Sequence, residues 1–211
     1  MRRIRKKDGI RTYSSDTDLV ETRRKEIIAR ATRVFVKQGY HETNMRDLAA
    51  SIDMSVGSIY HYVGAKQDIL YLIINVAVTR QSDWIDRIKA NLETRSATEV
   101  LKDFMRSYYT NVEEELDVTL FTYQETKNLD RKSQKTILDA AALDVEACAI
   151  ILRRGMENSE FKIANPLLMA HDIIVLGHMW AIRHWYLANI CTLEEYIREQ
   201  TDLILARISN K

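Results

Sequence analysis

The sequence is poor in the residues that interrupt or cross-link helices. It contains one Pro, six Gly and two Cys among 211 residues. Few positions can therefore break a helix, and we expect a nearly all-helical chain. Cys148 and Cys191 stand far apart and belong to no paired motif, which predicts buried free thiols and argues against a disulfide or a zinc site.

Long apolar segments are also missing. No run of about 18 apolar residues occurs, so no membrane-spanning helix and no membrane partner are expected. The basic start, residues 1–7, lacks the apolar segment of a signal peptide, which predicts a cytoplasmic protein. Hydrophobic residues make up 46% and charged residues 29% of the chain, as in soluble globular proteins with an ample core.

The net charge of +1 conceals an uneven distribution. Residues 1–66 hold 14 Lys/Arg against 8 Asp/Glu, whereas the other 145 residues hold 17 against 22. A basic N-terminal third joined to an acidic remainder is typical of a nucleic-acid-binding domain attached to a domain with another role. Unevenly distributed solvated charge is the alternative.

The most informative stretch is 43–66. Thr43 can cap a short helix, in which Met45, Leu48, Ala49 and Ile52 fall at helical spacing. Asp53-Met54-Ser55 then forms a turn, because Asp tolerates the left-handed conformation and Ser55 can cap the next helix. Two short helices joined by such a turn form a helix-turn-helix, whose second helix enters the DNA major groove.

The remaining periodicity predicts three regions: a basic flexible arm (1–17), a helix-turn-helix domain (18–66) and a helical ligand-binding and dimerisation domain (67–211). A helix from Thr22 to Gln38, ended by Gly39, should pack behind the two short helices. The fold class is therefore all-α, a three-helix N-terminal domain followed by a helical bundle. Further helices are expected at 66–81, 82–92, 98–113, 118–128, 130–158, 167–187 and 192–208.

Residues 23–70 resemble the DNA-binding domain of TetR-family transcriptional regulators. The resemblance lies in Gly39-Tyr40, Thr43, Arg46-Asp47-Leu48-Ala49, Ser55, Gly57-Ser58-Ile59-Tyr60-His61-Tyr62 and Lys66-Gln67-Asp68-Ile69-Leu70. The chain departs from the family in four places. Ile52-Asp53-Met54 stands where Ala-Gly-Val is usual, and Val56 stands where a polar or basic residue is common. Val63 stands for a common Phe, and Ala65 replaces a Ser that caps the next helix.

The resemblance implies two kinds of DNA contact. Phosphate contacts are expected from Thr43, Tyr60, His61 and Lys66, which fix the register of the protein on DNA. Base contacts are expected from Arg46, Ser55, Ser58 and Gly57, since Arg can bind guanine O6 and N7 with two donors. Tyr60 as a core aromatic and His61 as an ordinary surface histidine are the alternatives.

One such domain contacts too few base pairs for specificity in a genome, so we expect a homodimer on a palindromic operator in double-stranded DNA. The segment 167–187 is apolar nearly all round and needs partners on more than one side. In the family the last two long helices pair in the dimer, which implies an interface that includes Leu168, Ile174, Trp185 and Leu203. Burial inside a monomer is the alternative.

The C-terminal domain is rich in large side chains, which indicates an apolar pocket for a small-molecule effector. The predicted lining is Phe104, Tyr108, Phe121, Tyr123, Met156, Trp180 and Arg183. Residues 179–186 and 125–129 resemble segments of family members that sense acyl-CoA thioesters, which implies an apolar or acyl-CoA effector. Arg183 would then bind a carboxylate or phosphate, or form a structural ion pair. No cofactor is required.

Catalysis is not expected, because no nucleophile elbow and no pair of catalytic bases occurs. We therefore predict a ligand-responsive repressor. Two alternatives remain: a sequence-independent architectural DNA-binding protein, and a metal-responsive regulator using His171, His178 and His184.

Overall fold

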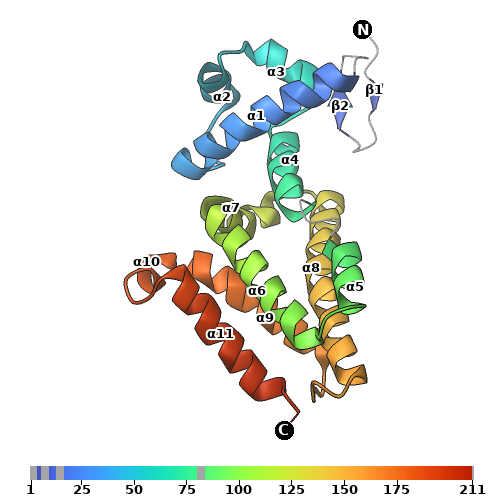
Figure 1. Ribbon diagram of the computed structural model, residues 1–211. Helices are drawn as coiled ribbons and strands as arrows, with labels where there is room; N and C mark the ends of the chain where they lie inside the picture. The colour runs from blue at the N-terminus through green and yellow to red at the C-terminus, as the bar shows by residue number, and fades with distance from the viewer. Residues whose placement is uncertain (1–3, 6–9, 13–16, 80–83, 211) are drawn as a thin grey trace. The chain divides into compact units, whose positions relative to one another are not determined.

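A computed structural model describes residues 4–5, 10–12, 17–79 and 84–210, and these residues form an almost entirely helical protein (Figure 1). The predicted all-α class is confirmed. The chain divides into two compact units. The N-terminal unit comprises Met1–Ala77 and Phe121–Ile137, and the C-terminal unit comprises Val78–Leu120 and Leu138–Lys211. We describe each by itself.

The N-terminal unit contains α1 (Thr17–Gln38), α2 (Met45–Ile52), α3 (Val56–Tyr62) and most of α4 (Lys66–Thr79). Its second segment holds the end of α7 (Leu116–Glu125), the 3₁₀ turn η1 (Thr126–Asn128) and the start of α8 (Arg131–Glu157). Phe121 stacks on Phe35 of α1 with ring centroids 6.1 Å apart. Gln67 Nε2 donates to the Asn128 carbonyl over 2.8 Å. These contacts explain why residues 121–137 belong to this unit.

The predicted domain boundary therefore needs correction. We expected the N-terminal domain to end at residue 66, but the compact unit extends to Ala77 and includes 121–137. The chain passes between the units within three helices, α4, α7 and α8, and at no point within a loop. The helix predicted from Thr22 in fact begins at Thr17, although its end at Gln38 is as predicted. Gly39 follows it with a φ of +88°, which glycine adopts without strain.

The arm predicted at 1–17 lies partly outside the described residues. In its described part β1 (Ile4–Arg5) pairs antiparallel with β2 (Arg11–Thr12). Ile10 is buried beside them, and its carbonyl accepts a hydrogen bond from Arg24 Nη2 at 3.5 Å. The described part of the arm thus makes tertiary contacts that its polar, basic composition did not predict.

The C-terminal unit packs around α6 (Ala97–Glu114), which lies against α9 (Pro166–Ile182) and α11 (Leu193–Ile208) (Figure 1). It also contains α5 (Trp84–Leu92), the rest of α8, and α10 (His184–Leu187). Helices α6 and α9 approach closely at Gly177, where an added Cβ would lie 2.7 Å from the Tyr109 ring. Tyr109 is fully buried, and its hydroxyl donates to the Ile173 carbonyl of α9.

The single helix predicted at 167–187 is wrong, because Arg183 interrupts it and separates α9 from α10. The predicted Thr192 cap of the last helix is confirmed, with Glu195 completing a reciprocal capping box. Both cysteines are free thiols as predicted; Cys148 is fully buried and Cys191 is half-buried. Across the described segments, no helix combines the length and the apolar character that crossing a membrane requires.

Candidate DNA-binding surface and ligand cavity

The turn between α2 and α3 has the predicted geometry. Asp53 adopts the left-handed conformation with a φ of 59°, and its amide donates back to the last turn of α2. Ser55 caps α3, because its hydroxyl accepts the Ser58 amide at 3.0 Å. Ile59 is fully buried and anchors α3 on its inner side. The turn thus fixes α3 with its other side outward.

The outward side of α3 carries most of the side chains predicted to contact DNA. Ser55, Gly57, Tyr60 and His61 are exposed, and Ser58 is half-buried. The Ser55 and Ser58 hydroxyls lie 2.7 Å apart and share a hydrogen bond. An added Cβ at Gly57 would meet the Ser55 hydroxyl at 3.8 Å, an ordinary contact, and no other atom of the described residues within 4 Å. This geometry suits close approach to a DNA groove.

Arg46 projects from the first turn of α2 and is exposed. Asn44 accepts the Arg46 and Asp47 amides at 2.8 and 3.0 Å, and Asp47 accepts the Asn44 amide in return. This reciprocal capping box fixes the start of α2. The predicted Thr43 cap is therefore wrong by one residue. The signal for the correct cap was the Asp three positions after Asn44.

Thr43 and Lys66 do not take the orientations predicted for phosphate contacts. Thr43 is only 2% exposed, and its hydroxyl donates to the Gly39 carbonyl at 2.8 Å. The Lys66 ammonium points inward, donates to the Tyr40 carbonyl and lies 4.2 Å from the Tyr40 ring centroid. Burial lowers the pKa of the Lys66 ammonium, and the nearby Glu125 and Glu42 carboxylates partly offset this effect. We assign both side chains to the packing of the N-terminal unit.

The missing Ser cap before α4 is replaced from within the helix. Asp68 Oδ2 accepts the Gly64 and Ala65 amides at 2.7 and 3.0 Å. These bonds satisfy amides that the usual cap would bind. The substitution by Ala65 thus leaves the start of α4 capped.

The residues predicted to line a ligand pocket do not come together. Phe104, Tyr108 and Trp180 belong to the buried core of the C-terminal unit. Phe121 instead packs on Phe35 in the N-terminal unit. The other three predicted residues are exposed: Tyr123, Met156 and Arg183. The Arg183 guanidinium lies 5.0 Å from the Trp185 ring centroid, a cation–π contact rather than the ion pair proposed as its alternative role.

A cavity of about 90 Å³ opens elsewhere in the C-terminal unit, between α5 and α8 beside the end of α4. Its lining is Val78, Thr79, Trp84, Ile85, Leu143, Asp144 and Ala147. Among these described residues, Asp144 is the acidic one. Sequence reasoning missed Trp84 and Asp144 as a pair, because no local pattern reveals that residues so distant in the chain share a cavity.

Trp84, which lines this cavity, packs against two further aromatic rings. The Trp84 ring centroid lies 5.0 Å from that of Phe104 and 5.9 Å from that of Tyr108, in edge-to-face contacts. Phe104 and Tyr108 stack at 5.8 Å. Such contacts hold the rings in fixed orientations.

Tyr108 connects the aromatic cluster to two titratable groups. Its hydroxyl lies 2.7 Å from His178 Nε2 and donates a long hydrogen bond of 3.5 Å to Asp144 Oδ2. Burial raises the pKa of Asp144 to about 6, and the Tyr108 hydrogen bond opposes this shift. Burial, assisted by the charge of His171, lowers the pKa of His178 to about 4. Near pH 7 the cluster therefore carries an ionised carboxylate and a neutral imidazole.

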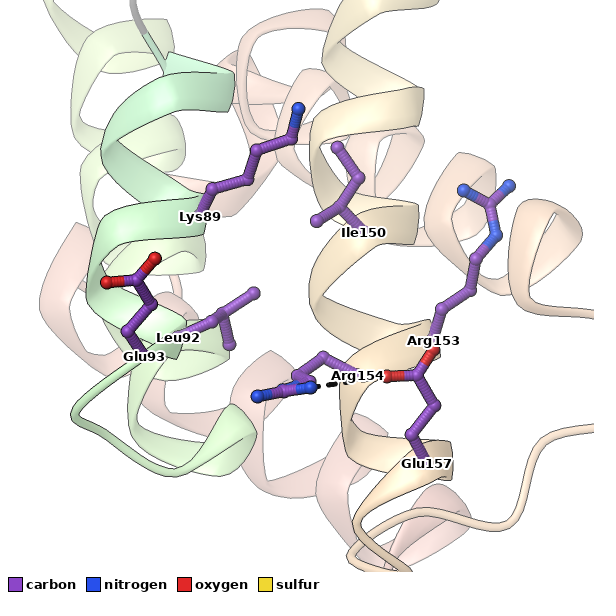
Figure 2. Close-up of a pocket in the computed structure, with 7 residues that line it drawn as sticks. All are labelled: Lys89, Leu92, Glu93, Ile150, Arg153, Arg154 and Glu157. Carbon is purple, nitrogen blue, oxygen red and sulfur yellow. Dashed lines mark hydrogen bonds and ion pairs between the residues drawn. The ribbon is translucent and has the colours of Figure 1, made fainter.

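A second, larger depression of about 350 Å³ lies toward the other end of α5 and α8. Figure 2 shows Lys89 and Arg154 extending into it while the Arg153 guanidinium points away. Arg154 pairs with Glu157 at 3.5 Å, and Arg153 pairs with Glu146 at 2.6 Å. Glu93 adds a further negative charge to the lining. The groove is open and nearly balanced in charge, which does not favour a highly charged ligand.

The predicted interface residues separate into two groups. Leu168, Trp185 and Leu203 are 56%, 68% and 60% exposed, and they lie on α9, α10 and α11. Tyr186 and Ile190 are exposed as well. Ile174, in contrast, is buried in the core of the unit, so its assignment to the interface is wrong. Exposed large apolar side chains thus occur on each of α9, α10 and α11.

The histidines proposed as metal ligands have separate partners. His171 lies 3.6 Å from Asp172, His178 contacts Tyr108, and His184 packs edge-on against Trp180. Within the ranges that the structure covers, no three His, Cys, Asp or Glu side chains are grouped so as to hold a metal ion.

Comparison with known proteins extends the resemblance. Residues 27–71 match the family model described as bacterial regulatory proteins, tetR family. The chain is 29% identical over 192 residues to the HTH-type transcriptional regulator HbdR of Aromatoleum sp. (strain CIB), covering 91% of this chain and 83% of HbdR. It is 22% identical over 150 residues to a fatty acid metabolism regulator protein of Bacillus subtilis (strain 168), covering 71% and 76% of the two chains.

Solved structures share the fold along nearly the whole chain. The TetR family transcriptional regulator PfmR of Thermus thermophilus is 26% identical with a TM-score of 0.73, covering 86% of this chain and 97% of PfmR. The structure of AibR in complex with isovaleryl coenzyme A and operator DNA superposes with a TM-score of 0.74 at 17% identity, covering 88% and 99%. The similarity thus includes the C-terminal unit, for which the sequence alone has no diagnostic motif.

Proposed function

Because the chain belongs to the TetR family of bacterial regulatory proteins, we propose that it is a ligand-responsive repressor that binds a palindromic operator as a homodimer. Its effector would be a small apolar molecule or an acyl-CoA thioester, and it would have no catalytic role. Members of this family are DNA-binding transcriptional regulators. To this we add the palindromic operator, the homodimer and the effector.

The observation that supports specific DNA binding best is the outward face of α2 and α3. Arg46 is exposed at the start of α2, and Gly57 leaves the start of α3 open for close approach. Arg46, Ser55, Gly57 and Ser58 would lie against base edges, while Tyr60 and His61 would bond phosphate oxygens. A bidentate contact from Arg46 to guanine would contribute about 1–3 kcal/mol of discrimination between bases.

A homodimer would place two such faces about one helical turn of DNA apart, roughly 34 Å. The exposed apolar side chains of Leu168, Trp185 and Leu203 support this arrangement, because a monomer would leave them in water. Two-fold symmetry of the protein would then impose two-fold symmetry on the operator.

The effector would bind in the C-terminal unit. The cavity beside Trp84 has mostly apolar walls with two polar side chains, Thr79 and Asp144, which is the usual composition of a ligand site. AibR, which shares the fold, is known in complex with isovaleryl coenzyme A and operator DNA, so the fold can bind both kinds of partner. An effector that prefers one conformation by about 1–3 kcal/mol would change operator affinity about 5–150-fold.

Selection from a pool of random double-stranded DNA tests the proposal. Enriched sequences should contain two inverted half-sites with centres about 10 base pairs apart or a multiple of that. Sedimentation of the protein should show a dimer at micromolar concentration. A panel of acyl-CoA thioesters should then include at least one that releases the selected DNA. Strong binding at low salt with no enriched sequence would instead favour an architectural DNA-binding protein.

A further inference from the structure

The cavity beside Asp144 contains an unusual combination of groups. Among the described residues that line it, the one acidic side chain lies beside aromatic and aliphatic ones: Trp84, Ile85 and Leu143 line the same space. Tyr108 of α6 donates a hydrogen bond to the carboxylate, and the Tyr108 hydroxyl also contacts His178 of α9. Neither the predicted helix-turn-helix nor the predicted pocket accounts for this cluster.

Among the described residues, little compensates the charge of Asp144. The hydrogen bond that it accepts from Tyr108 is long at 3.5 Å, and Tyr108 Oη also contacts His178 at 2.7 Å. Among the described residues no Lys or Arg forms an ion pair with Asp144, and the neighbouring His178 is neutral near pH 7. A half-buried carboxylate in this setting is destabilised unless it meets a hydrogen-bond donor or a positive charge.

We propose that this cavity holds the inner end of the effector and that Asp144 selects an effector whose inner end carries a hydrogen-bond donor, a hydroxyl or a protonated amine. The inference rests on the proposed function in one respect, that the chain has an effector. It goes further because it assigns the chemistry of the group bound in this cavity and the residue that selects it.

The dimensions limit what this end can be. A volume of about 90 Å³ corresponds to about three water molecules, or to a head group of a few non-hydrogen atoms. The donor would bond Asp144 Oδ1 or Oδ2, and the adjoining carbon atoms would pack on the Trp84 ring and Ile85. A protonated amine would gain in addition from the faces of the aromatic cluster. A plain alkyl end would displace water from the carboxylate and offer it no partner.

Small fragments can show whether the cavity prefers a hydroxyl or an amine to a group without a hydrogen-bond donor. The donor probes are 1-butanol and butylamine, and methyl propyl ether is the donor-free isomer of 1-butanol. NMR titration of the full-length dimer should show both donor probes perturbing the Trp84 indole signal. Their affinities should exceed that of the ether by about 10-fold, or 1.4 kcal/mol. Among acyl-CoA thioesters, 3-hydroxybutyryl-CoA carries the hydroxyl donor and butyryl-CoA lacks it, so these two compounds provide the same comparison.

Two variants separate the contribution of the acceptor oxygen of Asp144 from that of its negative charge. Asp144→Leu removes the acceptor and should abolish the preference for both donor probes. Asp144→Asn keeps an acceptor oxygen without the charge, so it should retain the preference for 1-butanol and lose most of that for butylamine. Asp139→Asn, an exposed change on the same helix, should leave all three affinities as in the wild type.

Equal binding of the ether and both donor probes would overturn the proposal, as would the absence of any fragment effect on Trp84. An unchanged preference in Asp144→Leu would overturn it too. Operator binding is measured separately, without fragments. A chain that binds no operator would refute the repressor function, whereas the fragment titration would still decide the chemistry of the cavity.

Discussion

Replacing Asp144 by Asn should make the protein more stable. The substitution keeps the size of the side chain and an oxygen that can accept from Tyr108, but it removes the charge. Burial raises the pKa of Asp144 from 3.8 to about 6. At about 1.4 kcal/mol per pKa unit, the ionised carboxylate destabilises the folded state by at most about 3 kcal/mol. Because Asp144 is only half-buried and solvent screens part of this effect, we expect about 1–2 kcal/mol.

The pH dependence provides the sharper check. A group with a raised folded-state pKa stabilises the protein below its unfolded pKa, and this contribution is lost as pH rises through the folded pKa. The wild type should therefore lose stability between about pH 4 and pH 6, whereas Asp144→Asn should not lose that contribution. The gain of the variant should be full at pH 8 and roughly half as large at pH 5.

Urea unfolding at several pH values, at one fixed protein concentration, measures the effect. The concentration must be held constant because the proposed dimer would contribute to stability. Asp139→Asn serves as the control and should change stability by less than about 0.5 kcal/mol at pH 8. A variant at Asp144 that is no more stable than the wild type at pH 8, or a gain that does not change with pH, would refute the account of this carboxylate.

Three further predictions concern packing, and each has a direct measurement. Lys66→Met should lower the free energy of unfolding by about 1–3 kcal/mol, because it removes the ammonium bound to the Tyr40 carbonyl. The salt dependence of DNA binding by the folded variant should be unchanged. A weaker dependence of DNA affinity on salt concentration would instead identify Lys66 as a phosphate contact. Gly177→Ala should destabilise the C-terminal unit by about 1–3 kcal/mol, since its Cβ would lie 2.7 Å from the Tyr109 ring; unaltered urea unfolding would show that the ring moves aside at little cost. Leu203→Lys should shift the protein toward monomer in sedimentation at micromolar concentration. Met156→Lys, a change at another exposed apolar side chain, is the control and should not cause this shift. A fully dimeric Leu203 variant would exclude this part of α11 from the interface.

Local chemistry explains what could be predicted from the sequence. The α2–turn–α3 segment was predictable because its determinants are local: Asp53 adopts the left-handed conformation and donates its amide to the end of α2, and Ser55 accepts the Ser58 amide. The same local logic failed at Thr43, since two capping residues stand side by side and only Asp47 distinguishes them. The break at Arg183 had no Gly or Pro to indicate it.

Tertiary contacts account for the rest. The inward orientation of Lys66 depends on the Tyr40 carbonyl, which lies 26 residues away in the chain. Phe121 was assigned to a pocket because large apolar side chains can serve either a core or a ligand, and only its contact with Phe35 decides between them. The Asp144 cluster joins α6, α8 and α9, and no spacing within one helix would have revealed it.

Operator binding by Arg46→Ala tests the central claim most directly. Affinities for a selected palindromic duplex and for a random duplex of equal length are measured at the same salt concentration, with the exposed Arg87→Ala on α5 as a matched control. We predict that Arg46→Ala loses about 1–3 kcal/mol on the palindrome, loses much less on the random duplex, and relaxes the preference at one base pair of each half-site. Equal losses on the two duplexes, or no loss on either, would contradict sequence-specific recognition by this face.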